Sequence, residues 1–218
     1  MKTKKTIYQK YIKRLLDIIL SLLAIIITSP IFIIIGILVL IFLGKPAIFR
    51  QKRPGKNEKI FTMYKFRTMN NKKDSDGKLL PDNQRLTKFG IFLRKTSLDE
   101  IPEFINILKG DMSFIGPRPL AVSYLPYYTD KEKHRHDVTP GLTGLAQING
   151  RNNLQWEEKF IYDLEYIENI SFINDMKIIL KTIKKVLCKS DITVRGEGKI
   201  IDFDEHRKKQ IGGTTIWI

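Results

Sequence analysis

The sequence contains little that could build a metal centre or a disulfide framework. Its 218 residues include one cysteine, Cys188, and three histidines. This excludes an internal disulfide and a zinc site made of several thiolates. The P-loop pattern G-x-x-x-x-G-K-[ST] and the dinucleotide-binding pattern G-x-G-x-x-G are also absent, as is the G-x-S-x-G of serine hydrolases. Acidic and cationic side chains therefore remain as the candidates for chemistry.

Negative charge is scarce. Thirty-eight Lys and Arg residues face 23 Asp and Glu residues, so the net charge is +15. Such a balance favours an anionic partner: nucleic acid, acidic lipid or a phosphorylated substrate. No nucleic-acid-binding module is recognisable, so we expect no nucleic-acid partner. The apolar fraction of 43% fits one globular domain, with or without a membrane element.

One apolar run predicts membrane association. No charged residue occurs from Ile18 to Leu43, which is longer than an ordinary core helix or the core of a signal peptide. The residues on both sides of the run are basic, so the positive-inside rule favours both flanks on the cytoplasmic side. A single spanning helix would place them on opposite sides.

Ser29 and Pro30 lie near the middle of this run. Pro30 cannot donate to the carbonyl of Ile26, and we expect a kink there, with the Ser29 hydroxyl bonding to backbone groups that the break frees. Each arm of about 12 residues would reach only about 18 Å, less than a ~30 Å hydrocarbon core. A re-entrant hairpin that enters and leaves on one side is favoured over a kinked span, which stays open.

The remaining chain predicts a mainly helical α+β fold. We expect residues 1–44 to form the basic segment and membrane helix, 45–190 a cytoplasmic globular domain with a small β element, and 191–218 a polar tail. Ile60–Met69 alternates as a strand on which Lys65 and Arg67 share a face. Later apolar stripes at helical spacing, one of them backed by lysines, predict amphipathic helices that pack on the core or lie at the lipid headgroups. The latter stripe comprises Phe172, Met176, Ile179, Ile183 and Val186.

Asp99 and Glu100 are the candidate chemical centre, and two interpretations compete for them. Ser97 followed by Glu100 has the spacing of a capping box, which would make both residues helix-start devices. The helix so predicted would place Ile101, Phe104, Ile105 and Leu108 on one apolar face. Alternatively, the carboxylates belong to a phosphate-handling site, because a carboxylate with a divalent cation and nearby arginines can hold a diphosphate.

Basic and polar residues further along the chain support the second interpretation. Arg94 lies just upstream, and Arg118 stands between Pro117 and Pro119, where a stiff loop could fix it against a phosphate. The segment from Pro140 to Arg151 is punctuated by glycines and ends in polar residues. It is either a turn-rich connector or a loop that lines a substrate.

Four segments occur in one order: Lys65–Met69, Arg94–Glu100, Gly110–Pro119 and Pro140–Arg151. Together they resemble the bacterial sugar transferase family, the monotopic phosphoglycosyl transferases, from about Lys13 to Leu187. Among its members the chain is most similar to the small ones that begin N-linked protein glycosylation with a diacetamido-bacillosamine phosphate. The family's membrane helix is re-entrant and broken at Ser-Pro, which matches Ser29 and Pro30.

The resemblance implies a reaction in which a UDP-sugar gives its sugar 1-phosphate to polyprenyl (undecaprenyl) phosphate and UMP leaves. It implies a catalytic pair at Asp99 and Glu100, Mg²⁺ near Asp99, and a covalent phosphosugar on Asp99. It also implies a bacterial inner-membrane location, contact with membrane lipid and downstream glycosyltransferases as partners. The substrate-contacting residues would be Lys65, Arg67, Arg94, Arg118, Gln147, Asn149 and Arg151. A membrane-tethered scaffold that binds acidic lipid, and a lipid phosphatase, are the rival functions.

Overall fold

The computed structural model describes residues 6–150, 154–187 and 201–213. Arg151, one of the expected substrate contacts, lies outside these residues. Along the chain the elements are η1 (Tyr8–Ile12), α1 (Lys13–Leu43), β1 (Ile48–Pro54), η2 (Lys56–Glu58), β2 (Ile60–Phe66), α2 (Asp82–Arg85), α3 (Lys88–Lys95), η3 (Leu98–Glu100), α4 (Glu103–Lys109), β3 (Ser113–Ile115), η4 (Val122–Tyr127), α5 (Asp130–Lys133), η5 (His134–His136), β4 (Gly141–Thr143), α6 (Leu145–Asn149), α7 (Trp156–Glu168), α8 (Phe172–Leu187) and α9 (Phe203–Gly213). The mainly helical α+β fold is confirmed.

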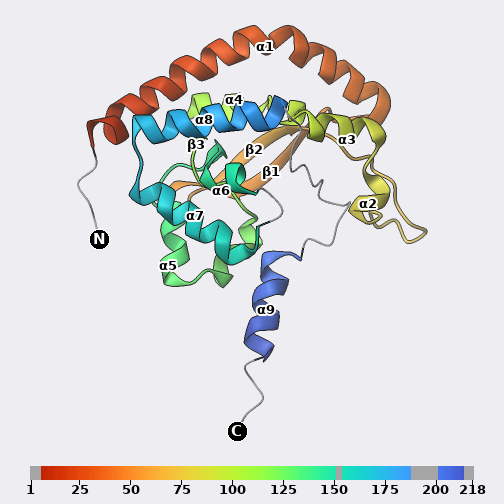
Figure 1. Cartoon of the computed structure of the whole chain (residues 1–218). Coiled ribbons are helices and arrows are strands. Elements are labelled where there is room, and N and C mark those ends of the chain that lie inside the picture. Colours follow the sequence, from red (N-terminus) through yellow and green to blue (C-terminus); the bar gives the residue numbers. More distant parts are fainter. Residues whose placement is uncertain (1–5, 151–153, 188–200, 214–218) are drawn as a thin grey trace.

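Helix α1 is one continuous helix through Pro30, so the break expected at Ser29 and Pro30 is absent, and the helix bows over the rest of the molecule like an arch (Figure 1). The Ser29 hydroxyl donates to the carbonyl of Ile26 at 2.8 Å. This is the carbonyl that Pro30 leaves without its helical donor, so the predicted role of Ser29 is confirmed. The helical segment Tyr8–Leu43 is long and apolar enough to cross a membrane, which indicates membrane association.

The two ends of α1 bind to the same globular body. At the first end, Lys13 pairs with Asp175 of α8 at 2.6 Å, and the Arg14 guanidinium donates to the carbonyls of Ile107 and Leu108, both at 2.7 Å. These carbonyls lie in the last turn of α4, where a cation compensates unpaired acceptors.

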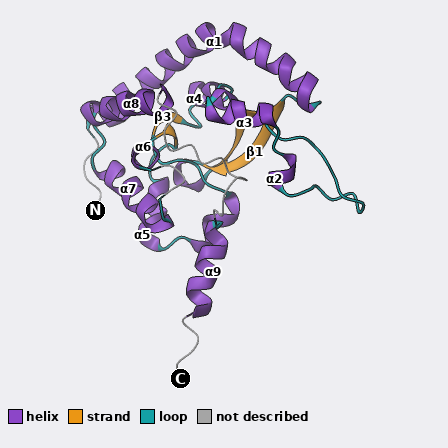
Figure 2. Cartoon of the chain, turned by 45° about the vertical axis from the view of Figure 1, so that its right-hand side comes forward, coloured by secondary structure: helices purple, strands orange, loops and turns teal. Residues whose placement is uncertain are grey.

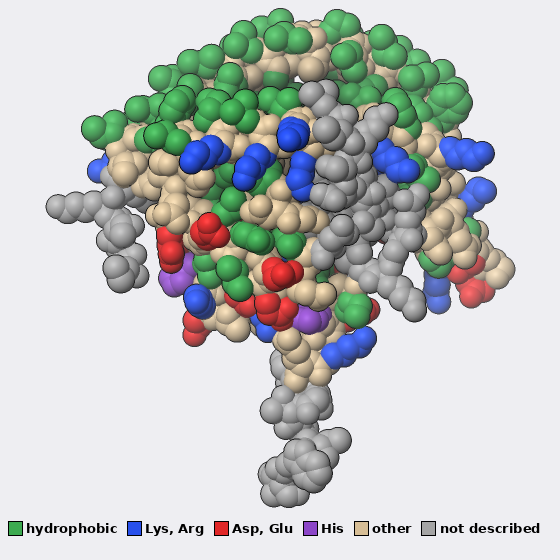
Figure 3. Space-filling view, viewed as in Figure 1, with side chains coloured by type: hydrophobic (Ala, Val, Ile, Leu, Met, Phe, Trp, Pro, Cys, Tyr) green, Lys and Arg blue, Asp and Glu red, His purple; other side chains and the backbone are tan. Residues whose placement is uncertain are grey.

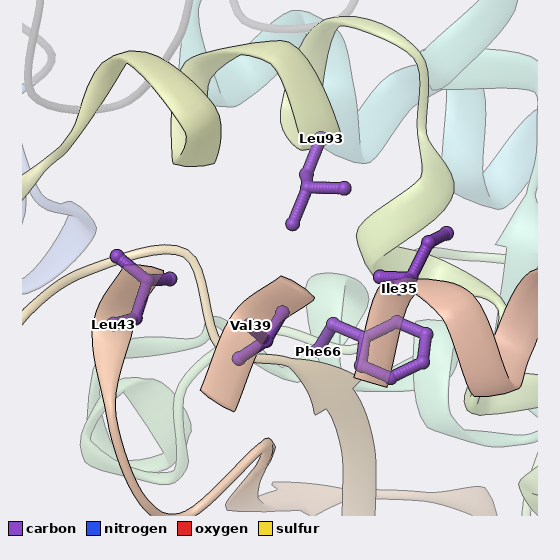
Figure 4. Packing of buried hydrophobic residues seen from close by; sticks show 5 residues of the cluster. All are labelled: Ile35, Val39, Leu43, Phe66 and Leu93. Carbon is purple, nitrogen blue, oxygen red and sulfur yellow. The ribbon is translucent and has the colours of Figure 1, made fainter. Parts of the chain in front are cut away.

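At the other end, one apolar cluster joins α1 to β2 and α3. Figure 4 shows it from close by: Ile35, Val39 and Leu43 of α1 face Phe66 and Leu93. All five residues are at most 7% exposed. Each contributes on the order of 1.5–3 kcal/mol when fully buried, so this end of α1 is held firmly on the body.

Two small sheets lie beneath the arch (Figure 2). Strands β1 and β2 are antiparallel, with Ile48 opposite Phe66, and β3 and β4 are parallel. The strand predicted over Ile60–Met69 ends at Phe66, and Lys65 and Arg67 both line one cavity. Met69 makes only an isolated bridge to Leu86.

The core-facing sides of α8 and α4 differ from the predicted apolar stripes. On α8 the buried residues are Asp175 and Ile178, whereas Phe172, Met176 and Ile183 are exposed. The alternative for this stripe, a place at the lipid headgroups, stays a prediction. On α4 the buried residues are Glu103, Asn106 and Ile107. In both helices polar groups with specific partners occupy the inner face, and apolar periodicity assigns such groups to the outside.

The exposed apolar residues gather on one side. In the space-filling view, apolar side chains cover the arch of α1, and a row of Lys and Arg side chains lies just below them at the level of α8 (Figure 3). Acidic side chains lie farther from the arch. This sequence of layers matches the order of hydrocarbon core, anionic headgroups and water.

Candidate active site

Asp99 and Glu100 lie in the short 3₁₀ turn η3, and the capping-box interpretation of Ser97 is wrong. Ser97 has φ 56° and ψ 17°, in the left-handed region, and its side chain makes no capping hydrogen bond. An N-cap residue has extended dihedrals instead. The strained backbone at Ser97 changes the direction of the chain after α3. As a result, the side chains of Asp99 and Glu100 point into the interior of the protein.

Glu100 is the point at which two cations meet. Its Oε1 atom accepts from Lys65 Nζ at 2.6 Å and from Arg118 Nη2 at 2.7 Å. Burial alone would raise the pKa of Glu100, but these two cations lower the pKa well below its ordinary value. Glu100 is therefore a poor proton acceptor in this arrangement and a strong anchor for positive charge.

Glu103 is a third carboxylate at this centre, which the sequence analysis missed. Its Oε1 atom lies 2.9 Å from Lys65 Nζ, and the side chain is 2% exposed. Lys65 thus bridges Glu100 and Glu103. Burial alone would lower the pKa of Lys65, but the two carboxylates raise it, so Lys65 stays charged. A clue existed in the sequence: a carboxylate one helical turn after Glu100 on a short amphipathic helix.

Asp99 differs from Glu100 because its carboxylate has no hydrogen-bonding or ion-pair partner among the described side chains. Within residues 6–150, 154–187 and 201–213, no side chain forms a hydrogen bond or ion pair with it. The residue is 8% exposed. Burial first, and then the charge of Glu100, raise the pKa of Asp99 to about 6, while Lys65, Arg94 and Arg118 act in the opposite direction. An ionised, unengaged carboxylate beside fixed cations is suited to nucleophilic attack or to binding a cation.

These carboxylates line a large cavity of about 1850 Å³ under the arch of α1. Its apolar walls include Leu20, Leu23 and Ile27 of α1 and Ile179 and Ile183 of α8. Polar side chains also line it, among them Lys65, Arg94, Asp99, Glu100, Arg118 and Gln147. The cavity is thus wide enough for a nucleotide sugar and has both apolar and charged lining residues.

The structure brings together most of the predicted contact residues. Arg94 Nε donates to the Thr68 hydroxyl at 3.0 Å and lines the cavity. The amide atoms of Gln147 are buried and have no hydrogen-bond partner within the described residues. A buried, unsatisfied amide on a cavity wall is suited to a polar ligand. Asn149 is exposed at the end of α6 and does not line the cavity.

Arg67 has a different role from its neighbour Lys65. Its guanidinium is 7% exposed and donates to the carbonyls of Leu43 and Lys45, both at 2.5 Å, and its Nε donates to Met69 at 2.7 Å. These carbonyls belong to the end of α1 and the turn after it, which a buried arginine compensates. Arg67 therefore fixes the exit of α1 and has few donors left for a ligand.

The glycine-punctuated segment is close-packed backbone. A Cβ atom on Gly141 would lie 2.1 Å from the Gly116 nitrogen, so only glycine lets β4 approach the loop that carries Arg118. Gly141 N donates to the carbonyl of Pro117 at 3.0 Å, and Gly116 N donates to Thr143 at 2.9 Å. This segment thus holds the Arg118 loop in place.

The chain is similar in sequence to known proteins. The family model "Bacterial sugar transferase" matches residues 8–189. An uncharacterized sugar transferase of Bacillus subtilis, EpsL, is 50% identical over 181 residues, which cover 83% of this chain and 90% of that protein. A UDP-glucose:undecaprenyl-phosphate glucose-1-phosphate transferase of Klebsiella pneumoniae is 46% identical over 79% of this chain and 39% of its own length.

An undecaprenyl-phosphate galactose phosphotransferase of Salmonella typhimurium is 38% identical over 82% of this chain and 41% of its own length. The chain therefore spans nearly all of the Bacillus protein and about two fifths of the two named transferases.

Proposed function

The chain belongs to the bacterial sugar transferase family, and we propose that it transfers a sugar 1-phosphate from a UDP-sugar to polyprenyl phosphate. The products would be a polyprenyl-diphosphate-sugar and UMP. The observation that carries the proposal is the open carboxylate of Asp99, next to a Glu100 that holds two cations at 2.6 and 2.7 Å. The names of the Klebsiella and Salmonella relatives describe transfers of this kind.

Asp99 would act as the nucleophile. In the first step an Asp99 oxygen bonds to the sugar-bearing phosphorus of the UDP-sugar, the bond from this phosphorus to the UMP oxygen breaks, and UMP leaves. The product is a mixed anhydride between Asp99 and the sugar phosphate. In the second step an oxygen of polyprenyl phosphate attacks the same phosphorus and frees the Asp99 carboxylate. Two displacements replace one difficult transfer between two bound anions.

Glu100 would organise positive charge rather than carry protons. Lys65 and Arg118 both bind its Oε1 atom, and both keep the pKa of Glu100 low. A diphosphate entering the cavity would meet cations that are already held in place by Glu100. Such preorganised charge stabilises a phosphoryl transition state without rearranging at the moment of reaction.

Asp99 also fits the magnesium ion that the family resemblance implies. Mg²⁺ in phosphoryl-transfer sites binds one or two carboxylates together with substrate phosphates. The carboxylate of Asp99 is unengaged, whereas the cations on Glu100 and Glu103 oppose a metal there. Asp99 would hold the ion, which would neutralise phosphoryl oxygens of the bound UDP-sugar.

We further propose that α1 is a re-entrant hairpin in the bacterial inner membrane and that the catalytic body is cytoplasmic. Both ends of α1 bind the same body, through Lys13 and Arg14 at one end and Arg67 at the other. The basic row below the apolar arch would lie at the headgroups (Figure 3). Cysteines introduced at Thr3 and at Asn57 should both react with an impermeant thiol reagent from the cytoplasmic side only. Periplasmic labelling at position 3 would indicate a spanning helix.

One experiment tests the reaction and its intermediate. Purified enzyme is mixed with each of several UDP-sugars, including UDP-glucose, UDP-galactose and UDP-N,N'-diacetylbacillosamine, first without acceptor. About one UMP per active enzyme and a phosphosugar adduct on the Asp99 peptide are expected, and neither should occur in Asp99→Asn. Polyprenyl phosphate should then give turnover with the same sugar.

Other outcomes identify other functions. UMP that appears only after acceptor is added would favour a single direct displacement. Release of inorganic phosphate from a lipid phosphate, with no UMP from any UDP-sugar, would indicate a lipid phosphatase. Binding to acidic vesicles with no product from any substrate, and no loss in Asp99→Asn, would indicate the non-catalytic scaffold.

A further inference from the structure

A buried ion pair lies in the wall of the same cavity as the candidate active site, in residues that the sequence analysis did not single out. Arg135 of η5 donates to Asp163 Oδ2 of α7 through Nε at 3.0 Å and through Nη2 at 2.8 Å. Both residues are 3% exposed. Buried ion pairs are often no more stabilising than apolar residues of the same size. A contribution to stability alone therefore does not account for this pair.

The second contact of Arg135 leads to the active site. Its Nη2 atom also donates to the backbone carbonyl of Arg118 at 2.8 Å. The side chain of Arg118 in turn reaches Glu100 at 2.7 Å. A continuous chain of charge-assisted contacts thus runs from Asp163 through Arg135 to the backbone of Arg118 and on to Glu100.

The guanidinium of Arg135 is itself fixed on its remaining sides. Its Nη1 atom donates to the Tyr128 hydroxyl at 3.3 Å. The group lies 5.7 Å from the ring centres of Tyr128 and Phe160. The aromatic rings near its guanidinium and the Asp163 carboxylate at its edge together fix the orientation of the Arg135 side chain.

The carbonyl of Arg118 needs such a partner. Its neighbours Pro117 and Pro119 have no N–H group. Backbone hydrogen bonds hold the loop on either side, from Gly116 to Thr143 and from Gly141 to Pro117. At Arg118 itself the anchor is the side chain of Arg135, so the orientation of this peptide depends on η5 and α7.

We propose that Arg135, held by Asp163, is a positioning residue for Arg118 in binding the diphosphate of the substrate. The proposal rests on the function given above. If the Arg118 peptide rotates, the Arg118 guanidinium moves away from Glu100, where it lies beside Lys65. Misplacement of a substrate-positioning group by about 1 Å can cost on the order of 100-fold in rate.

The test is a double-mutant cycle in UMP release without acceptor, with KM for the UDP-sugar and the single-turnover rate measured separately. Arg135→Lys keeps the charge but loses the planar fork, and Asp163→Asn removes the charge that orients Arg135. Each should lower the efficiency of UMP release about tenfold or more. In an Arg118→Lys background the same changes should cost less than about threefold, because coupled residues are not additive.

Arg207→Lys is the matched control. Arg207 of α9 pairs with Glu132 of α5 on the same body, and neither residue lines the cavity. Its effect should be equal in the wild-type and Arg118→Lys backgrounds. Thermal melting of each variant separates lost fold from lost positioning. If Arg135→Lys does not fold, Asp163→Asn decides by the same cycle.

Two failures remain distinct. Effects of Arg135→Lys and Asp163→Asn that multiply with that of Arg118→Lys would overturn the positioning proposal, because they would then act independently of Arg118. A folded wild-type enzyme that releases no UMP from any UDP-sugar would instead overturn the proposed function.

Discussion

The ionisation of Asp99 should control the pH dependence of the first chemical step. Burial and the charge of Glu100 raise the pKa of Asp99 to about 6. A carboxyl group with this pKa is roughly 90% ionised at pH 7 and roughly 10% ionised at pH 5. Only the carboxylate attacks phosphorus, so the rate of UMP release should fall about tenfold between these values. An aspartate with an ordinary pKa near 3.9 would lose less than about 10% of its rate.

The assay is a single turnover with UDP-sugar well below its KM and no acceptor, because the rate then follows the pKa of Asp99 in the free enzyme. Leaving out polyprenyl phosphate matters, because a phosphate monoester has its own pKa near 6 and would mask the enzyme's titration. The diphosphate of a UDP-sugar carries substituents at both ends and keeps its charge in this range. Circular dichroism at each pH verifies that the protein stays folded.

A charge variant tests the cause of the shift. Lys65 lowers the pKa of Asp99, so Lys65→Met should move the midpoint of the profile to higher pH as well as slow the reaction. Lys133→Met is the control, since Lys133 pairs with Asp130 on the surface and does not line the cavity. A rate that stays constant from pH 7 to pH 5 in folded enzyme, or a midpoint in Lys65→Met that moves to lower pH, would refute the reasoning.

Three further changes have defined outcomes. Arg118→Lys keeps the charge but loses the fork, so UMP release should fall by about 2–3 kcal/mol, or roughly 30- to 150-fold; near-wild-type turnover would remove Arg118 from the site. Glu103→Gln frees Lys65 from one of its two carboxylates and should slow turnover by about 1 kcal/mol, or roughly fivefold, whereas Glu165→Gln on the exposed side of α7 should not. Burial lowers the pKa of His136 to about 4, so an unfolded chain takes up a proton near pH 6.5 that the folded chain refuses. The free energy of unfolding should therefore fall as the pH drops from about 6.5 to about 4, and urea titrations of His136→Gln should show a smaller fall.

Local sequence patterns predicted the features that depend only on residues close together in the sequence. The uncharged run gave the long apolar helix, and Ser29 beside Pro30 gave the hydrogen bond to Ile26 that the structure contains. These features need only the chain on either side. The strand over Ile60–Phe66 was predicted for the same reason. Its end was predicted too late, at Met69, because the Arg67 side chain donates to carbonyls at the end of α1.

Contacts that join distant segments could not be predicted from local sequence patterns. Lys65 meets Glu100 across 35 residues, and Arg135 meets Asp163 across 28. Ser97 and Glu100 have the spacing of a capping box, yet the left-handed backbone at Ser97 sends Glu100 to Lys65 and Arg118 instead. Local spacing favoured the cap, and the tertiary ion pairs prevailed.

The same ion pairs explain how one site can keep a carboxylate ready to attack a phosphate. Two anions repel each other, so a free aspartate facing a diphosphate would be disfavoured without compensating charge. Here Lys65 and Arg118 converge on Glu100, one residue from Asp99. Both cations lower the pKa of Asp99 without bonding to it. Asp99 thus keeps most of its charge at neutral pH and leaves its oxygens open, while Glu100 holds the cations where a substrate diphosphate would need them. This division of labour requires two adjacent carboxylates of different environment, and a single carboxylate could not supply both functions.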